Sequence, residues 1–358
     1  MEHKKARLIA YYLPQFHPIP ENDTWWGKGF TEWTNVGKAK PLFKGHYQPR
    51  VPADLGYYDL RIPEVRELQV ELAKEAGIEG FCYWHYWFGG GRRLLEKPIN
   101  EVLASGKPDF PFCFGWANET WSGIWHGLGK KILIEQTYPG KEDNEAHFYE
   151  VLPAFQDGRY IRIDNKPVFQ IYQPLKLKDA KEFIALWNDL ALKSGLDGIY
   201  FIAHSNDSLA YDNLISLGFD GVNIVRTGEI MKHERSFFDK VLNKLRSDNS
   251  LKVFEYSDAI KYFLCREMKK ENCFPTIIPN WDHSPRSGKK GLILHGSTPE
   301  LFRKHVSEAL DLVAGKEIDK KIIFVKSWNE WAEGNYLEPD LQFGHSYLHV
   351  LRDLVLKK

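Results

Sequence analysis

The sequence predicts an α/β fold: a single TIM-like (β/α)8 barrel with extended loops after its strands, formed by residues 1–358. Three observations predict it. Short apolar runs recur eight times, helical patterns lie between most of them, and aromatic and polar side chains gather directly after the runs. Alternating strands and helices favour a parallel sheet, and eight such units favour a closed barrel over an open doubly wound sheet.

The eight predicted strands are rich in Ile, Val, Phe and Tyr and almost continuously apolar, as strands buried on both faces should be. They are Arg7–Leu13, Glu79–His85, Pro111–Trp116, Pro167–Tyr172, Gly198–His204, Gly221–Val225, Phe274–Pro279 and Lys321–Ser327. No Gly-rich phosphate loop follows the first of them, which argues against a nucleotide-binding doubly wound sheet.

Helices are predicted where apolar residues recur at helical spacing between these runs. The segment Pro63–Ala76 shows this pattern with Val65, Leu68 and Leu72, and Gly77 provides a stop signal. The same reasoning predicts helices over Ala180–Leu192, Phe237–Leu245, Ser257–Glu267 and Pro299–Ala314.

Composition excludes several partners. The 48 basic residues balance the 48 acidic ones, so charge gives no reason to bind nucleic acid. No apolar run approaches the roughly 18 residues of a membrane span. The apolar stretch Leu8–Leu13 is too short for a secretory signal, and the four cysteines form no C-x-x-C pair. We therefore expect a cytoplasmic protein with free thiols, without a cofactor or a metal.

Chemistry in such a barrel takes place at the C-terminal ends of the strands. Nine of the 12 tryptophans follow the predicted strands, at positions 25, 26, 33, 84, 87, 116, 281, 328 and 331. Indole rings stack on the apolar faces of sugars, and neighbouring polar groups bind sugar hydroxyls, so the pattern predicts a site for an oligo- or polysaccharide. The candidate sugar-binding residues are Tyr12, Gln15, His17, Trp33, Tyr83, Trp84, His85, Trp116, Asn118, Glu119, Tyr172, His204, Trp281, Asp282, Trp328 and Asn329.

Two carboxyl groups are needed to cleave a glycosidic bond, and Glu330 and Glu333 after the eighth strand are the best pair. A turn would bring them to the same side. The flanking Trp328 and Trp331 are expected to desolvate one of them, raising its pKa so that it serves as a general acid. The competing carboxylates are Glu32, Glu119 and Asp282, each of which could equally accept hydrogen bonds from sugar hydroxyls.

Several long motifs resemble the WbsX-type family, whose members are usually described as glycosyltransferases or lipopolysaccharide biosynthesis proteins. They are Tyr11–Pro18, Trp25–Trp33, Phe114–Glu119 and Trp328–Gly334. That family is similar to family 99 glycoside hydrolases, which are (β/α)8 endo-acting α-mannosidases and mannanases. The chain departs from those hydrolases in its Trp-rich first loop and in Phe114–Glu119, which bears on the substrate more than on the mechanism.

The resemblance implies a role for each glutamate. Glu330 would act as a base on the sugar 2-hydroxyl, so that the substrate's own O2 attacks C1 through an anhydro-sugar intermediate. Glu333 would be the general acid/base for the leaving group. We therefore expect a retaining glycoside hydrolase or transglycosidase acting on a bacterial surface polysaccharide of the O-antigen or lipopolysaccharide type.

Two other functions remain open. A glycosyltransferase of O-antigen biosynthesis would need a diphosphate site, and the chain has neither an Asp-x-Asp motif nor a Gly-rich phosphate loop. A non-catalytic carbohydrate-binding protein would not need the pair Glu330 and Glu333. A metal-dependent hydrolase is disfavoured because the histidines suggest no ligand cluster.

Overall fold

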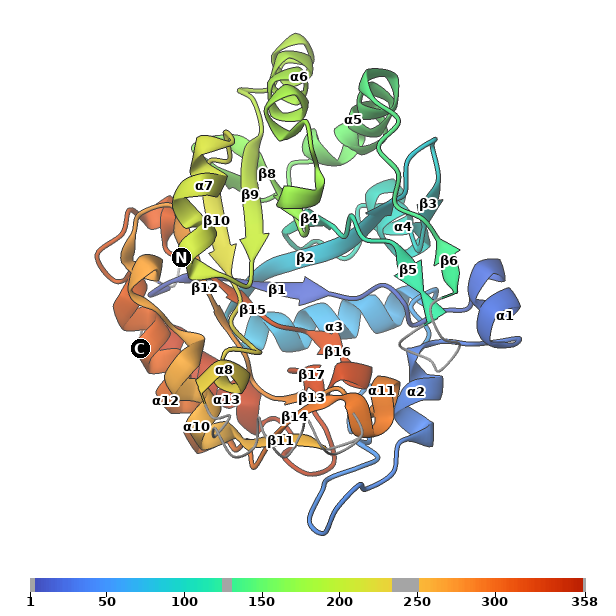
Figure 1. Ribbon diagram of the computed structural model, residues 1–358, viewed down its shortest axis with the longest axis vertical. Helices are drawn as coiled ribbons and strands as arrows, with labels where there is room; N and C mark the ends of the chain where they lie inside the picture. The colour runs from blue at the N-terminus through green and yellow to red at the C-terminus, as the bar shows by residue number, and fades with distance from the viewer. Residues whose placement is uncertain (1–3, 124–130, 234–250, 357–358) are drawn as a thin grey trace, which may run out of the picture.

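The computed structural model describes residues 4–123, 131–233 and 251–356. Eight parallel strands form its centre, in the order β1-β15-β12-β10-β9-β8-β4-β2, and β1 also pairs with β2, which closes the barrel (Figure 1). The predicted α/β barrel and all eight of its strands are confirmed. The strands are β1 (Arg7–Tyr12), β2 (Ile78–Trp87), β4 (Phe112–Trp116), β8 (Lys166–Ile171), β9 (Tyr200–Ser205), β10 (Gly221–Ile224), β12 (Cys273–Ile277) and β15 (Ile322–Val325).

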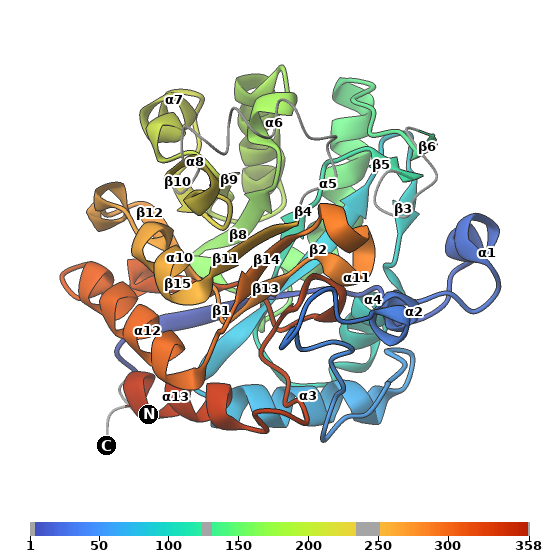
Figure 2. The same ribbon diagram turned by 60° about the horizontal axis from the view of Figure 1, so that its bottom comes forward.

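Helices surround the strands, and Figure 2 shows α3 and α13 running side by side below the barrel. They are α3 (Pro63–Glu75), α4 (Lys97–Ser105), α5 (Lys141–Phe155), α6 (Ala180–Lys193), α7 (Tyr211–Ser216), α10 (Tyr256–Phe263), α12 (Pro299–Val313) and α13 (Ser346–Val355). No helix of the described ranges is long and apolar enough to cross a membrane.

Three predicted helices match α3, α6 and α12 closely. The fourth, Ser257–Glu267, is shorter than predicted: α10 ends at Phe263, and a separate 3-10 turn covers Arg266–Lys269. The fifth, Phe237–Leu245, lies outside the described residues. Helix α5 was not predicted, because Pro153 lies inside it and its apolar residues show little helical periodicity.

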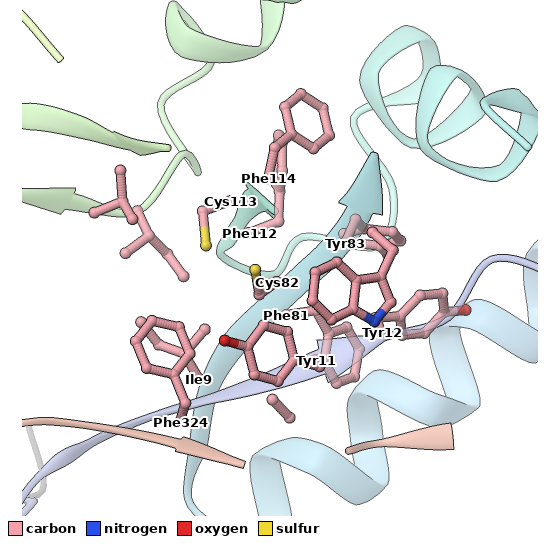
Figure 3. Close-up of a cluster of buried hydrophobic side chains, with 14 of the residues drawn as sticks. Ile9, Tyr11, Tyr12, Phe81, Cys82, Tyr83, Phe112, Cys113, Phe114 and Phe324 are labelled. Atoms are coloured by element: carbon pink, nitrogen blue, oxygen red, sulfur yellow. The ribbon is translucent and has the colours of Figure 1, made fainter. Parts of the chain in front are cut away.

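Hydrogen-bonded polar side chains from three strands meet inside the barrel, among the apolar residues shown in Figure 3. The Tyr11 hydroxyl lies 2.7 Å from Oδ1 of Asn223 and accepts a 2.6 Å hydrogen bond from Nε2 of Gln170. The Tyr11 ring stacks on Trp84, with centroids 4.7 Å apart. Cys82 and Cys113 are buried free thiols in the same cluster, as expected. This packed interior supports the residues at the strand ends above it.

Short elements after the strands build the mouth of the barrel. The sheet β11-β14-β13 and the hairpin β16-β17 lie together below the barrel strands in Figure 1. The elements are α1 (Pro20–Trp26), α2 (Glu32–Lys38), β3 (Arg93–Leu94), β5 (Trp121–Ser122), β6 (Ile132–Ile134), α8 (Ile230–His233), β11 (Lys252–Glu255), β13 (Trp281–Asp282), α11 (Ser284–Ser287), β14 (Leu292–His295), β16 (Asn329–Glu330) and β17 (Asn335–Tyr336). Strand β7 (Arg162–Ile163) instead pairs with the start of β8, at the opposite end of the barrel.

Candidate active site

A cavity of about 720 Å³ opens at the C-terminal ends of the barrel strands. Its wall contains both candidate catalytic residues, Glu330 and Glu333. Six of the predicted sugar-binding residues also line it: Gln15, Trp84, Glu119, Tyr172, His204 and Trp281. Aromatic rings and polar groups therefore surround the two carboxyls, as a sugar site requires.

The two glutamates are positioned by a tight reversal of the chain. Glu330 ends β16, a 3-10 turn covers Trp331–Glu333, and the chain returns in β17, where Asn335 pairs with Glu330. Gly334 makes the reversal with a φ of 55°, in the left-handed region that favours glycine. A Cβ at this position would lie 2.6 Å from the Cβ of Asp282, so both conformation and space require glycine.

Glu330 is surrounded by hydrogen-bond donors. Its Oε1 accepts a 3.0 Å hydrogen bond from Nε1 of Trp84, and its Oε2 accepts one of 3.3 Å from Nδ2 of Asn335. The Nζ atom of Lys326 lies 3.6 Å from the same Oε2 and 5.4 Å from the ring centroid of Trp281. Burial raises the pKa of Glu330, and Lys326 acts against that rise.

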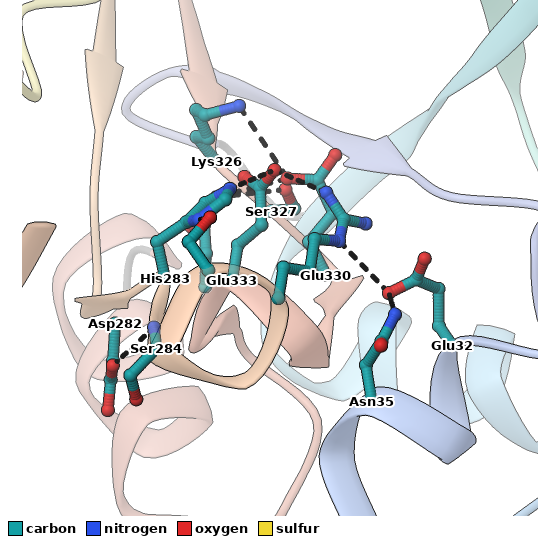
Figure 4. Close-up of polar contacts among 12 residues, drawn as sticks. Glu32, Asn35, Asp282, His283, Ser284, Lys326, Ser327, Glu330 and Glu333 are labelled. Carbon is teal, nitrogen blue, oxygen red and sulfur yellow. Dashed lines mark hydrogen bonds and ion pairs between the residues drawn. The ribbon is translucent and has the colours of Figure 1, made fainter. Parts of the chain in front are cut away.

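Glu333 has an arginine and a histidine as neighbours instead (Figure 4). Its Oε1 accepts a hydrogen bond from NH1 of Arg286 and lies 3.5 Å from Nε2 of His283. Burial alone would raise the pKa of Glu333, but Arg286 and His283 outweigh it and hold that pKa well below its usual range. In this arrangement a proton shared by the two carboxyls resides on Glu330 rather than on Glu333.

Neutral rings complete the wall around Glu330. The Tyr172 ring packs edge-on against Trp84, with centroids 5.5 Å apart, and at a tilt against His204, with centroids 4.8 Å apart. Burial and the nearby Lys326 lower the pKa of His204 to about 3, so the imidazole is neutral near pH 7. A neutral imidazole can donate one hydrogen bond and accept another, which suits a sugar hydroxyl.

Four predicted sugar-binding residues lie outside the cavity because their side chains leave the barrel on its outer face. The Tyr12 hydroxyl donates to Oε1 of Gln69 on α3, and Tyr83 packs beside it. His85 pairs with His147 on α5, and Trp116 stacks on Phe183 on α6. Successive residues of a strand point to opposite faces, so only alternate residues of each aromatic cluster can reach the cavity.

The other six predicted residues that are absent from the cavity wall hold loops together or pack beneath them. Asn118 bonds the backbone of Gln173, Asn329 bonds that of Leu13, and Asp282 accepts from Gln48. The placement of these side chains therefore does not support a contact with sugar. All six are buried or half-buried: His17, Trp33, Asn118, Asp282, Trp328 and Asn329.

The expected desolvation of a glutamate by Trp328 and Trp331 needs correction. Neither ring lines the cavity: Trp331 donates from Nε1 to Oε2 of Glu338 at 2.6 Å, and Trp328 packs on Phe81. The indole that contacts Glu330 is that of Trp84. The two tryptophans of the motif thus lie below the turn that carries the glutamates.

Sequence analysis missed Lys326 and Tyr86, which both line the cavity. The signal for Lys326 was present, because this charged residue directly follows the apolar residues 322–325 of the predicted strand, at its C-terminal end. Tyr86 lies two residues after Trp84 and therefore shares its face of β2. Glu32, considered only as a competing carboxylate, reaches the site from α2 and receives a 3.0 Å hydrogen bond from Nε of Arg286.

No group of three His, Cys, Asp or Glu side chains that could hold a metal ion occurs in the described ranges. Contrary to the expectation from the sequence, one pair of histidines has the His-x-x-x-His spacing of metal ligands, His345 and His349. His345 forms an ion pair with Asp54, and its ring lies 5.9 Å from that of His349. Neither histidine lines the cavity that contains Glu330 and Glu333.

Known structures share this fold. One is described as a glycoside hydrolase-like protein, with a TM-score of 0.62 and 16% identity, and the match covers 100% of this chain and 96% of the other. Another is the GH99 endo-alpha-mannosidase from Bacteroides thetaiotaomicron, with a TM-score of 0.58, 14% identity, and coverage of 97% and 95%. At this level of identity the likeness concerns the fold alone.

Relatives by sequence come from Xanthomonas campestris pv. campestris, where strains B100 and ATCC 33913 each have an uncharacterized protein WxcX. They are 36% and 35% identical in alignments 358 positions long, which cover 98% of this chain and 50% of each relative. The chain thus spans about half the length of the curated relatives it matches. Residues 8–351 match the family model described as Glycosyltransferase WbsX. The chain therefore belongs to the WbsX family.

Proposed function

We propose that the chain is a retaining glycoside hydrolase or transglycosidase acting on a bacterial surface polysaccharide of the O-antigen or lipopolysaccharide type. The observation that carries the proposal is the position of Glu330 and Glu333 on one wall of an aromatic cavity, with Trp84, Tyr172 and Trp281. Membership of a family described by sugar chemistry supports a carbohydrate-active enzyme. The barrel shared with a GH99 enzyme is compatible with it.

In this proposal Glu330 takes the proton of the sugar 2-hydroxyl while O2 attacks C1, and Glu333 gives a proton to the departing glycosidic oxygen. Water then opens the anhydro-sugar at C1. Glu333 takes a proton from that water, and Glu330 returns its proton to O2, so both carboxyls regain their starting states. A second sugar in place of water gives transglycosylation, so the two outcomes differ only in the acceptor.

The proton must move from Glu330 to Glu333 before this reaction, because burial and Arg286 favour it on Glu330. A sugar supplies the reason for the move. Its 2-hydroxyl donates to Glu330 and so stabilises the ionised form, while the glycosidic oxygen accepts a hydrogen bond from the protonated Glu333. Substrate binding thereby selects the arrangement that the reaction needs.

The reversed assignment is the second candidate, favoured by the ion pair between Arg286 and Glu333. Glu330 would then be the acid and Glu333 the carboxylate that assists attack at C1. Aryl glycosides with a good leaving group distinguish the two, since they need no acid. If Glu333 is the acid, E333A keeps most activity on a dinitrophenyl glycoside and E330A does not.

The family description favours a glycosyltransferase as the alternative activity. A diphosphate needs cations that are available to it, whereas four of the five lysine and arginine side chains in the described wall already face carboxylates, Lys290 being the fifth. Arg286 and Lys326 contact Glu333 and Glu330, and Arg226 and Lys232 both contact Glu229. A sugar-binding protein without catalysis remains the third possibility.

One experiment separates these functions. The protein is mixed with purified bacterial surface polysaccharide alone, and separately with sugar nucleotides and an acceptor. New reducing ends without any nucleotide support the glycosidase. A changed distribution of polysaccharide chain lengths without new reducing ends supports the transglycosidase. Release of nucleoside diphosphate coupled to sugar transfer would contradict both, and binding of polysaccharide without any product or change in chain length would indicate a lectin-like role.

A further inference from the structure

The charges buried beside the cavity do not balance. Three carboxylates, Glu32, Glu330 and Glu333, face one guanidinium and one ammonium group, those of Arg286 and Lys326. Glu32 is only 2% exposed and Glu330 only 6%. A buried charge without a counter-charge raises the free energy of the folded protein. A cluster with one surplus carboxylate avoids this cost when one of its carboxyl groups stays protonated. The third carboxylate therefore decides whether the pair Glu330 and Glu333 holds a proton.

Arg286 links the two sides of this cluster. Its Nε donates to Oε2 of Glu32 at 3.0 Å, and its NH1 donates to Oε1 of Glu333. Burial would lower the pKa of Arg286, but Glu32 and Glu333 outweigh it and raise that pKa above its ordinary value. The guanidinium thus stays charged and divides its attraction between two carboxylates.

Glu32 is held in place by its own helix. It is the first residue of α2, whose N-cap Thr31 accepts a hydrogen bond from the backbone N–H of Trp33. The backbone N–H of Glu32 donates to the carbonyl of Gln15 at 3.2 Å, and Nδ2 of Asn35 donates to Oε2 of Glu32 at 3.4 Å. Figure 4 shows Glu32 and Asn35 approaching the glutamate pair from the side opposite His283.

We propose that Glu32 is a positioning residue of the reaction: its carboxylate neutralises Arg286, so that Glu333 can carry the proton that leaves with the glycosidic oxygen. This inference rests on the proposed function. Without Glu32, Arg286 would pair with Glu333 alone and hold it ionised. With Glu32, the guanidinium keeps a partner when Glu333 becomes neutral.

Other titratable groups face the same cluster. Tyr86 on β2 is influenced by Glu32, Glu330 and Glu333 together, and burial raises its pKa, so it stays neutral. His283 is the N-cap residue of α11, and its Nε2 lies 3.5 Å from Oε1 of Glu333. Protonation of this imidazole would add a third cation to the cluster. The titrations below are therefore repeated in an H283N background, in which the charge count depends on the carboxylates alone.

The test is a carboxyl titration of the full chain labelled with ¹³Cδ-glutamate, assigned with E330Q and E333Q. In the wild type, the pair Glu330 and Glu333 is expected to keep one proton. The ¹³Cδ signals of the pair should then show a titration step at a pH above the ordinary pKa range of glutamate. In E32Q that step moves to lower pH by about one unit or more. E21Q removes the same charge from neighbouring α1, outside the cavity wall, and leaves the step in place.

An unchanged step in E32Q, or a step at higher pH, would overturn the proposal. R286Q gives a second, independent reading should E32Q fail to fold: loss of the guanidinium must move the step upward, and a downward move or no move contradicts the proposal. No substrate enters these titrations. A wild type that cleaves no polysaccharide would therefore overturn the proposed function, while the titration alone decides the role of Glu32.

Discussion

Nε1 of Trp84 donates a 3.0 Å hydrogen bond to Oε1 of Glu330, across 246 residues of sequence. The bond joins β2 to β16, which follows the last barrel strand. Two segments far apart in the sequence therefore define the position of one carboxyl. The Trp84 ring is itself held by Tyr11, stacked at 4.7 Å inside the barrel. Packing within the barrel thereby fixes the orientation of the proposed base.

The W84F variant tests this bond. A hydrogen bond to a charged group contributes about 1.5–3 kcal/mol, so its loss is expected to lower kcat roughly tenfold to hundredfold. W87F is the matched control, because Trp87 also donates an indole hydrogen bond, to Asp143 at 3.1 Å, but outside the cavity. Equal losses in both variants would show that the Trp84 bond has no special role.

The K326M variant tests the charge beside Glu330. Lys326 lowers the pKa of this carboxyl, so its removal is expected to raise that pKa further. A base works only when ionised, and the acidic limb of the kcat/KM profile should therefore move to higher pH. K326R keeps the positive charge, so the acidic limb of its kcat/KM profile should stay at the wild-type pH. An acidic limb that stays in place in K326M, or moves to lower pH, would contradict Glu330 as the base.

The G334A variant tests the reversal that carries both glutamates. The left-handed φ and the 2.6 Å approach to Asp282 together predict a loss of about 3 kcal/mol or more in the free energy of unfolding. Gly344 is the matched control, with a φ of 50° and open space around its Cβ direction, so G344A should cost only about 1 kcal/mol. Urea unfolding measures both, and equal costs would exclude the contact with Asp282.

The E338Q variant tests the buried carboxyl below that turn. Burial raises the pKa of Glu338 to about 7, although Trp331, Gln69 and Tyr58 donate hydrogen bonds to it. Because the folded state binds this proton more tightly than the unfolded one, stability is full below the ordinary glutamate pKa and is lost as pH rises to about 7.

This loss amounts to about 3 kcal/mol between pH 4.5 and 7 for a shift of that size. A glutamine cannot ionise, so E338Q should show a flatter stability profile over this range in thermal or urea unfolding. A wild type and a variant with parallel profiles would contradict the raised pKa.

Local patterns sufficed for the barrel strands, since the residues of each strand predict it on their own. They predicted only α3, α6, α10 and α12 among the helices around the barrel. The same reasoning placed Glu330 and Glu333, because a barrel concentrates chemistry after its strands. It treated consecutive residues of β2 alike, and the alternation of side chains then separated Trp84 in the cavity from Tyr83 and His85 outside it. Applying that alternation to the sequence would have excluded Tyr83 and His85 from the predicted sugar-binding residues.

The remaining contacts could not be read locally. Arg286 meets Glu32 across 254 residues and Glu333 across 47, and only the closed barrel brings them together. The motif tryptophans Trp328 and Trp331 look like sugar ligands in the sequence, yet the tight turn directs them into the core. A pattern of residue types indicates a site but leaves the direction of each side chain to tertiary packing.

The most direct test of glycosidase chemistry at Glu330 and Glu333 is hydrolysis of purified bacterial surface polysaccharide in ¹⁸O-labelled water, with no sugar nucleotide present. Wild type is expected to produce new reducing ends that carry ¹⁸O at C1, whereas E330Q and E333Q produce almost none while still binding the polysaccharide. New reducing ends at the wild-type rate in both variants would contradict this account. So would a wild type that yields neither new reducing ends nor a changed distribution of polysaccharide chain lengths.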